Sequence, residues 1–392
     1  MIKNFATSLT HLGEKNPPSV SSSKSIPISM SSVFVFDDVE TLDAVYEGKT
    51  EGYVYSRNGN PVHDALEEII TKIDEGEDSQ VFSSGMAAIS MAIVSQIKSG
   101  DHIIASSVLY GGTYQFLKTE LSKFNVEVTF IDVVNDDIEK YFKSNTKLVY
   151  IETISNPLME VIDLRAIAFK THNHKAKLIV DNTFATAIVC QPLNLGADIV
   201  VYSATKYLGG HSDVTGGIVV ASKAIIIDVK NTGASYGPMM SPFDAWLLIR
   251  SLRTLELRII QHSNNALKLA EFLEKHPKIE NVYYPGLKTS PSYNIANNIF
   301  NNNLYGGMLS IDLKSGERGA YELIRQLKTI KFVPSLAGVT TSVSYPIKTS
   351  HRALNNEELK AAHISKGLIR VSTGLENIDD LISEFDKSLN KI

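Results

Sequence analysis

Short apolar runs alternate with helix-length amphipathic segments between residues 80 and 221. Apolar runs that are separated in this way predict buried strands joined by helical crossovers. Such crossovers make neighbouring strands parallel and place helices on both faces of the sheet. We therefore predict an α/β fold with a mainly parallel, seven-stranded sheet. The expected strands are 80–82, 102–105, 126–131, 148–151, 178–180, 199–202 and 217–221.

The chain divides into three parts by composition and rhythm. Residues 1–60 are rich in Ser, Pro and Thr and carry little periodicity, so we expect an irregular arm that either is disordered or lies across a partner subunit. We predict a large domain over 61–250 and a smaller α+β domain over 251–392. Across the boundary of these domains, residues 241–277 predict a long helix that is either continuous or broken.

A lysine stands directly after the strand expected at 199–202. The ammonium of Lys206 is costly to bury unless it is paired or chemically used. One use is a Schiff base with an aldehyde cofactor, and the alternative is a solvated loop lysine. Asp181 ends the preceding strand, where a carboxylate would suit the ring nitrogen of pyridoxal phosphate.

Other polar side chains follow strands in the same way. Ligands of parallel sheets bind beyond the carboxyl ends of the strands. We therefore expect Tyr110, Asn156, Asp181 and Lys206 to converge on one crevice. Arg57 lies in a turn-rich stretch and is interpreted either as a solvated surface residue or as a phosphate ligand.

Composition excludes several kinds of protein. A net charge of -5 and a pI near 6.1 argue against a nucleic-acid partner or a polybasic membrane anchor. The single cysteine, Cys190, excludes an intrachain disulfide and a Cys-rich zinc site. No apolar run approaches the roughly 20 residues that span a bilayer. We expect a cytoplasmic protein with no metal and a small-molecule substrate.

Several motifs carry a resemblance to a known family. They are Tyr55-Ser56-Arg57-x-Gly59-Asn60-Pro61, Ser84-Gly85-Met86, Tyr110-Gly111-Gly112-Thr113, Asp181-Asn182-Thr183-Phe184, Ser203-Ala204-Thr205-Lys206-Tyr207, Gly210-His211-Ser212-Asp213 and Arg370-Val371-Ser372-x-Gly374-Leu375-Glu376. In these motifs the chain resembles the Cys/Met-metabolism family of pyridoxal-phosphate enzymes from Tyr53 to Glu376. The resemblance implies the type I fold of aspartate aminotransferase and an assembly of two dimers that share active sites.

The resemblance also implies roles at the cofactor. Lys206 would bind it covalently and shuttle protons, Asp181 would pair with the ring nitrogen, Tyr110 would stack on the ring and assist catalysis, and Asn156 would contact the 3-hydroxyl. Two residues, Tyr55 and Arg57, would reach the phosphate of a neighbouring subunit. Within one subunit, the ligands of the cofactor phosphate would be Gly85, Met86, Ser203 and Thr205.

At the substrate, the resemblance implies that Arg370 clamps the α-carboxylate with help from Ser335 and Asn156. Thr340 replaces a glutamate that lies near the distal end of the substrate in relatives. Gly112 stands where methionine γ-lyases usually carry a cysteine. We therefore expect a cystathionine γ-lyase or cystathionine γ-synthase. The alternatives are a methionine γ-lyase, another C–S lyase of the family that acts by β-elimination, and a non-catalytic protein of the same fold.

Overall fold

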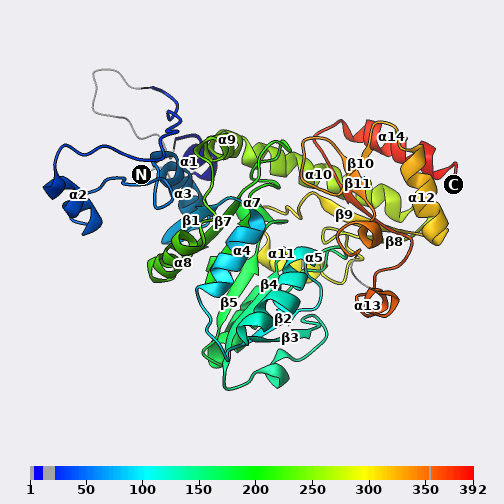
Figure 1. Cartoon of the computed structure of the whole chain (residues 1–392). Helices are drawn as coiled ribbons and strands as arrows, with labels where there is room; N and C mark the ends of the chain where they lie inside the picture. Colours follow the sequence, from blue (N-terminus) through cyan, green and yellow to red (C-terminus); the bar gives the residue numbers. More distant parts are fainter. Residues whose placement is uncertain (1–3, 12–22, 353–354) are drawn as a thin grey trace.

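The computed structural model describes residues 4–11, 23–352 and 355–392 of the chain. The first sheet lies in the middle of the molecule, and a second, smaller sheet lies toward the C-terminus (Figure 1). The arm that carries α2 (Val39–Tyr46) extends from the opposite side.

The central sheet confirms the predicted fold class. Within the described residues it holds seven strands in the order β1-β7-β6-β5-β4-β2-β3. The five strands from β6 to β3 are parallel, and β7 pairs antiparallel with both of its neighbours. Their bounds are β1 (Asp78–Phe82), β2 (His102–Ser106), β3 (Glu127–Ile131), β4 (Thr146–Glu152), β5 (Lys177–Asp181), β6 (Ile199–Ser203) and β7 (Gly217–Ala221).

The sheet is buried on both faces, which explains why its strands read as continuous apolar runs. Successive residues of β6 belong to different cores: Val200 packs with the cluster around α3 (Pro61–Ile73), and Val201 packs with the cluster around α4 (Gly85–Val94). On its outer side, α3 also packs against α9 (Pro242–Leu252).

The second sheet has the order β10-β11-β12-β9-β8 among the described residues. Its central strand β12 (Leu368–Ser372) is fully buried and pairs antiparallel with β9 (Met308–Leu313) and β11 (Ser342–Ser344). The outer strands are β8 (Ile279–Tyr283) and β10 (Lys331–Phe332). The helices α10 (Leu255–Glu274) and α12 (Gly316–Gln326) cover this sheet.

One detail differs from the sequence predictions, and one open point is resolved. The helix expected over 241–277, for which the sequence left a break open, is broken into α9 and α10 at Arg253 and Thr254, where the backbone of Thr254 leaves helical geometry. The arm is not irregular throughout, because it contains α1 (Phe5–His11) and α2. Leu9 of α1 is buried in the main core, and α2 is capped by the Asp38 carboxylate, which accepts the Thr41 N–H at 2.7 Å. Residues 1–3 and 12–22 of the arm lie outside the described residues.

The other helices connect the strands or close the chain. They are α5 (Gly111–Gln115), which continues into η1 (Phe116–Glu120) and η2 (Leu121–Phe124), α6 (Leu164–Asn173), α7 (Thr186–Val189), α8 (Lys223–Tyr236), α11 (Tyr293–Ile299), α13 (Asn356–Ala361) and α14 (Ile378–Leu389), with the short turns η3 (Ile138–Tyr141), η4 (Pro192–Leu195) and η5 (Pro346–Lys348). None of the helices in the described ranges combines the length and the apolar character needed to cross a bilayer.

Candidate active site

A cavity of about 820 Å³ opens at the carboxyl ends of β4, β5 and β6, a volume within the usual range for small-molecule sites. Tyr110, Asn156, Asp181 and Lys206 all line it, as the strand ends suggested. The second sheet supplies the facing wall. The other lining residues are Ser84, Gly85, Met86, Ile89, Glu152, Ile154, Thr183, Phe184, Ser203, Thr205, Thr215, Phe332, Pro334, Ser335, Leu336, Lys348, Thr349, Ser350, Arg352 and Arg370.

Lys206 lies in a tight turn after β6. Its backbone N–H donates to the Ser203 carbonyl at 3.1 Å, and its side-chain Nζ donates to Ser335 Oγ at 3.1 Å. Burial, with a smaller effect of the nearby Arg370 charge, lowers the pKa of the Lys206 ammonium. A larger neutral fraction makes this amine a better nucleophile and proton acceptor.

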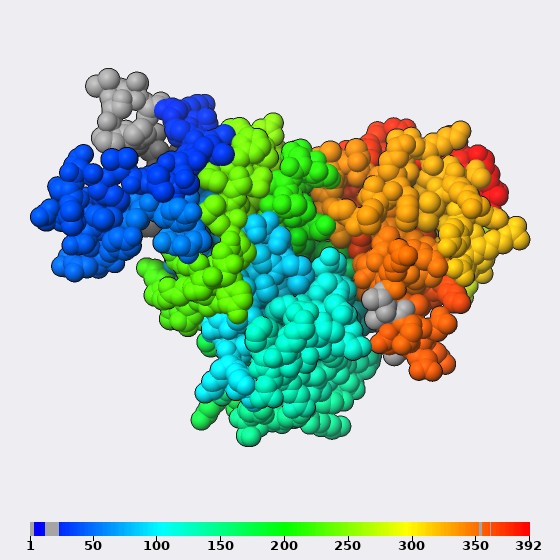
Figure 2. Space-filling model, viewed as in Figure 1, coloured from blue at the N-terminus to red at the C-terminus, as the bar shows by residue number. Residues whose placement is uncertain are grey.

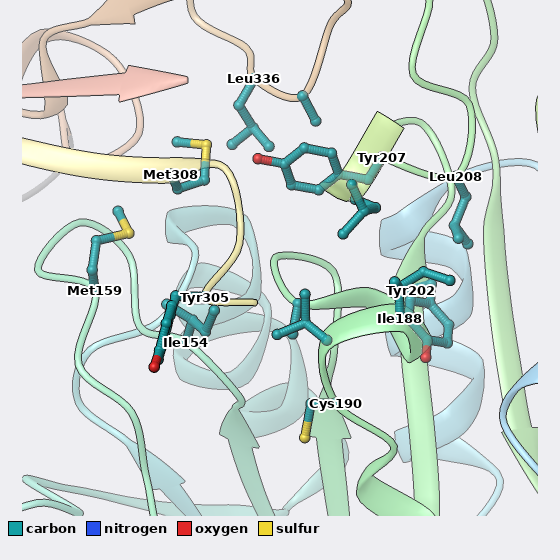
Figure 3. Packing of buried hydrophobic residues seen from close by; sticks show 14 of the residues in the cluster. Ile154, Met159, Ile188, Cys190, Tyr202, Tyr207, Leu208, Tyr305, Met308 and Leu336 are labelled. Carbon is teal, nitrogen blue, oxygen red and sulfur yellow. The ribbon is translucent and has the colours of Figure 1, made fainter. Parts of the chain in front are cut away.

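The next residue fastens this turn to the rest of the molecule. Tyr207 is fully buried and packs in one cluster with Met308 of β9 and with Leu336, which lies in the loop between β10 and β11 (Figure 3). Beneath the turn, the Arg258 guanidinium donates to the Tyr207 carbonyl at 2.7 Å and to the Ser251 carbonyl at 2.9 Å. These contacts fix the direction in which the neighbouring Lys206 side chain leaves the backbone.

Asp181 ends β5 with a buried carboxylate that has only neutral partners. It accepts the Thr183 N–H at 3.0 Å and the Tyr150 hydroxyl at 3.3 Å. No ion pair joins Asp181 to a cation in the part of the chain that the structure describes. Burial raises the pKa of Asp181, so a positive charge placed against it would be strongly favoured.

Glu152 ends the neighbouring strand and is paired in register with Asp181. Its carboxylate accepts the backbone N–H of Tyr110 at 2.6 Å. Burial, followed by repulsion from Asp181, raises the pKa of Glu152 well above its ordinary value. Through this bond Glu152 positions the backbone of Tyr110, whose side chain lines the cavity.

The N-terminus of α4 forms another end of the cavity. Ser84 caps the helix by accepting the Ala87 N–H at 3.1 Å, and Gly85 and Met86 form its first turn. A Cβ atom at Gly85 would lie 2.6 Å from the Ser203 Cβ, so only glycine fits there. Free N–H groups at this terminus, with the hydroxyls of Ser203 and Thr205, suit a phosphate.

Arg370 reaches the cavity from β12 in the second sheet. Its Nη1 donates to Asn156 Oδ1 at 2.9 Å, and its Nη2 donates to the Ser335 carbonyl at 3.4 Å. Burial lowers the pKa of Arg370 to about 10, which leaves the guanidinium charged at neutral pH. A planar cation held in this way suits a carboxylate.

Three predicted site residues lie outside this cavity in the single chain. Tyr55 is 42% exposed, and the Arg57 guanidinium lies 5.5 Å from its ring centre while donating to the Ala234 carbonyl at 2.6 Å. Thr340 is exposed and does not line the cavity. The roles expected for Tyr55, Arg57 and Thr340 stay predictions.

The sequence reasoning missed several residues that shape the site. Arg258, Lys348 and Arg352 were not singled out. A signal existed for Arg258, because it lies on the apolar face of α10 between Leu255 and Ile259, where a charge is expected only with partners. Nowhere in the described ranges do three or more His, Cys, Asp or Glu side chains gather in a way that could hold a metal ion.

The donor set fits pyridoxal phosphate. An amine with a lowered pKa, a buried carboxylate without a cation, and a helix N-terminus with hydroxyls correspond to the aldehyde, the ring nitrogen and the phosphate of that cofactor. The glycine at position 85 lets the start of α4 approach Ser203 closely, which brings the helix N-terminus and the Ser203 hydroxyl to the same end of the cavity.

Comparison with known proteins gives the same result. The chain is 41% identical over 371 residues to an L-methionine gamma-lyase of Fusobacterium nucleatum subsp. polymorphum, covering 94% of this chain and 93% of that protein. It is 41% identical over 356 residues to a cystathionine gamma-lyase of Bacillus subtilis, covering 90% and 93%.

A crystal structure from Campylobacter jejuni that contains N'-pyridoxyl-lysine-5'-monophosphate superposes with a TM-score of 0.94 at 30% identity. The superposition covers 99% of this chain and 100% of that one. The family model described as "Cys/Met metabolism PLP-dependent enzyme" matches residues 6–390. The chain therefore belongs to the Cys/Met metabolism family of pyridoxal-phosphate-dependent enzymes.

Proposed function

We propose that this protein acts at the γ-carbon of an amino acid, as a cystathionine γ-lyase or a cystathionine γ-synthase. One observation carries the proposal: Ser335 links the amine of Lys206 to the guanidinium of Arg370, accepting from Lys206 Nζ at its hydroxyl and from Arg370 at its carbonyl. An amino acid whose carboxylate binds Arg370 therefore has its α-carbon within reach of the Lys206 amine.

The chain's own groups then divide the work. When bound, pyridoxal phosphate supplies an electron-withdrawing ring that makes the C–H bond at the α-carbon acidic. Arg370 fixes the orientation of the substrate, and Lys206 takes the α-proton and carries it along the substrate. Tyr110 lines the same cavity, and in this proposal its hydroxyl gives a proton to the departing group.

A substrate panel with the purified holoenzyme tests this proposal. Release of 2-oxobutyrate and cysteine from cystathionine supports the γ-lyase. Consumption of an acyl-homoserine only when cysteine is present supports the γ-synthase. Release of pyruvate and homocysteine would instead assign β-elimination, and inactivity on all of these substrates would refute the proposal.

Methionine γ-lyase is the second candidate, because the relative from Fusobacterium nucleatum carries that name at 41% identity. Gly112 argues against it. A Cβ atom at Gly112 would lie 2.6 Å from the Tyr110 ring and 3.2 Å from Met86 Sδ, so a cysteine would displace that ring. Methanethiol release from methionine at a higher kcat/KM than cystathionine cleavage would favour this candidate.

The proposed enzyme works as a homo-oligomer in which the arm completes the active site of a neighbouring copy. The arm projects at one side of the molecule (Figure 2). It exposes several large apolar side chains, and contact with a second copy would bury them. These side chains are Met30, Val33, Val35, Val39, Tyr46 and Tyr55.

Mixed oligomers test the sharing of sites. Arg57→Ala and Lys206→Ala should each abolish most activity, and co-expressed mixtures should recover about a quarter of the wild-type activity through sites with both residues intact. Mixtures as inactive as the two parents, in subunits shown by mass spectrometry to be mixed, would place Arg57 outside the neighbouring site.

A further inference from the structure

Two cations at the mouth of the cavity have no role in the chemistry described above. Lys348 and Arg352 line the same cavity as Arg370, and both side chains are exposed. Across residues 4–11, 23–352 and 355–392, neither forms an ion pair with a carboxylate. Two unpaired cations that line one concave surface attract an anion from outside the chain.

The segment that carries them is held in place from within. Thr349 Oγ1 donates to the Tyr345 carbonyl at 2.9 Å, and the His351 N–H donates to the Pro346 carbonyl at 2.9 Å. The Tyr345 ring beneath it is buried, and its hydroxyl donates to the Lys366 carbonyl at 2.7 Å. The segment 346–352 is therefore a packed turn, so the fold sets the backbone positions from which the Lys348 and Arg352 side chains extend.

Two further contacts place this turn at the substrate end of the cavity. A Cβ atom at Gly111 would lie 2.1 Å from the Ser350 carbonyl, so the turn packs directly against the residue that follows Tyr110. His351 is buried beside Arg370 and the backbone of Asn156. The turn thus adjoins the groups that hold the α-carboxylate, whereas the phosphate end is formed by α4 and the residues after β6.

The carboxylates that line the cavity do not pair with Lys348 or Arg352. Those among its lining residues are Glu152 and Asp181, at the ends of β4 and β5. Glu152 is bonded to the Tyr110 backbone, and Asp181 is bonded to Thr183 and Tyr150. The charge of Lys348 and Arg352 is therefore available to a ligand.

We propose that Lys348 and Arg352 form a subsite for an anionic group at the distal end of the amino-acid substrate. This inference rests on the proposed function and narrows its substrate class. It favours amino acids that carry a second carboxylate or a phosphate beyond the γ-carbon, and it disfavours those with a neutral thioether end.

Binding of unreactive amino acids tests the subsite without depending on turnover. L-2-aminopimelate and L-2-aminoheptanoate share a seven-carbon chain and differ only in the distal carboxylate. Titrating each into the holoenzyme by calorimetry should show that aminopimelate binds about tenfold more tightly, and that most of this preference is lost at high salt. L-2-amino-5-phosphonopentanoate distinguishes a phosphate site from a carboxylate site.

Substitutions of the two cations show which side chains cause the preference for the distal carboxylate. Lys348→Gln and Arg352→Gln should each weaken aminopimelate binding about threefold, and the double variant should weaken it about tenfold. Lys360→Gln, a nearby exposed lysine outside the cavity, is the matched control and should bind both ligands as the wild type does.

The outcomes separate the two proposals. Equal binding of aminopimelate and aminoheptanoate to the wild type would overturn the subsite. An unchanged preference of the double variant for aminopimelate would also overturn it. A preference that disappears in the double variant supports it, and tighter binding of the phosphonate would assign the subsite to phosphate esters. Failure of the proposed γ-carbon reaction is detected separately, as the absence of products from the substrate panel.

Discussion

The carboxylate of Glu152 accepts the backbone N–H of Tyr110 at 2.6 Å while lying in register beside Asp181 on the neighbouring strand. Burial and the neighbouring Asp181 carboxylate both disfavour the charged form of Glu152, and this cost in free energy raises the pKa of Glu152. The bond to Tyr110 partly offsets that cost, since it satisfies an N–H at the start of α5. The pair therefore links the position of the Tyr110 ring to the carboxylates at the base of the cavity.

Substitution of Glu152 should separate its hydrogen bond from its charge. Glu152→Gln keeps an acceptor for the Tyr110 N–H, so we expect kcat to fall about tenfold or less. Glu152→Ala leaves that N–H without its partner, at a cost of about 1–3 kcal/mol, and should reduce kcat about 100-fold. Steady-state kinetics and the circular dichroism of the bound cofactor measure both effects. Equal losses in the two variants would show that the hydrogen bond does not matter.

Asp181→Asn tests the carboxylate at the ring nitrogen. The amide can still accept the Thr183 N–H, so the fold and the cofactor content should be preserved. Without the negative charge the ring nitrogen is less readily protonated, and we expect kcat to fall by at least about 100-fold. A cofactor absorption spectrum and a kcat both unchanged from the wild type would contradict the assignment.

Arg370→Lys tests the clamp on the substrate carboxylate. Lysine keeps the charge but loses the planar fork that bonds to Asn156 and Ser335. We expect KM to rise about 30-fold or more, equivalent to about 2 kcal/mol of lost binding. Steady-state kinetics with the same substrate for wild type and variant measures the changes in KM and kcat separately. A change confined to kcat would argue that Arg370 does not bind the ground-state substrate.

His262 should make stability depend on pH. Burial lowers its pKa to about 4, against about 6.5 in an unfolded chain, so the unfolded state binds the proton more readily. Its contribution is therefore complete above about pH 6.5 and is lost as the pH falls toward 4. Between pH 7 and pH 5 the wild type should lose about 2 kcal/mol more than His262→Asn, whose amide nitrogen lies near the position of Nδ1 and can still donate to the Thr373 carbonyl.

Urea unfolding of both proteins at the two pH values checks this prediction. His351, whose pKa burial also lowers to about 4, is present in both proteins and cancels in the comparison. Parallel losses in the wild type and the variant would mean that His262 does not titrate as described.

The local part of the site could be predicted from sequence, because strand ends are local features. Lys206 and Asp181 follow apolar runs, and parallel strands bring their ends to one edge. Contacts between distant segments could not be predicted in that way. The register between Glu152 and Asp181 and the packing of Ser350 against Gly111 depend on how whole elements pack.

The same limit explains the differences. Thr340 is close to Ser335 in sequence, yet it is exposed while Ser335 lines the cavity. The helices α1 and α2 are too short to show a clear period: α1 buries one apolar side chain, Leu9, beside Ser8, and α2 begins at the cap Asp38. The position of the break at Thr254 could not be predicted, because no Pro or Gly marks it in the sequence.

The central claim is that the amine of Lys206 binds pyridoxal phosphate, and reductive labelling tests it most directly. Borohydride treatment of the holoenzyme, followed by proteolysis and mass spectrometry, should place a pyridoxyl-phosphate adduct on the peptide that contains Lys206. Lys206→Ala, purified in the same way, should give no adduct at any lysine. An adduct on a different lysine of the wild type, or no adduct on a protein that retains the cofactor, would contradict the account.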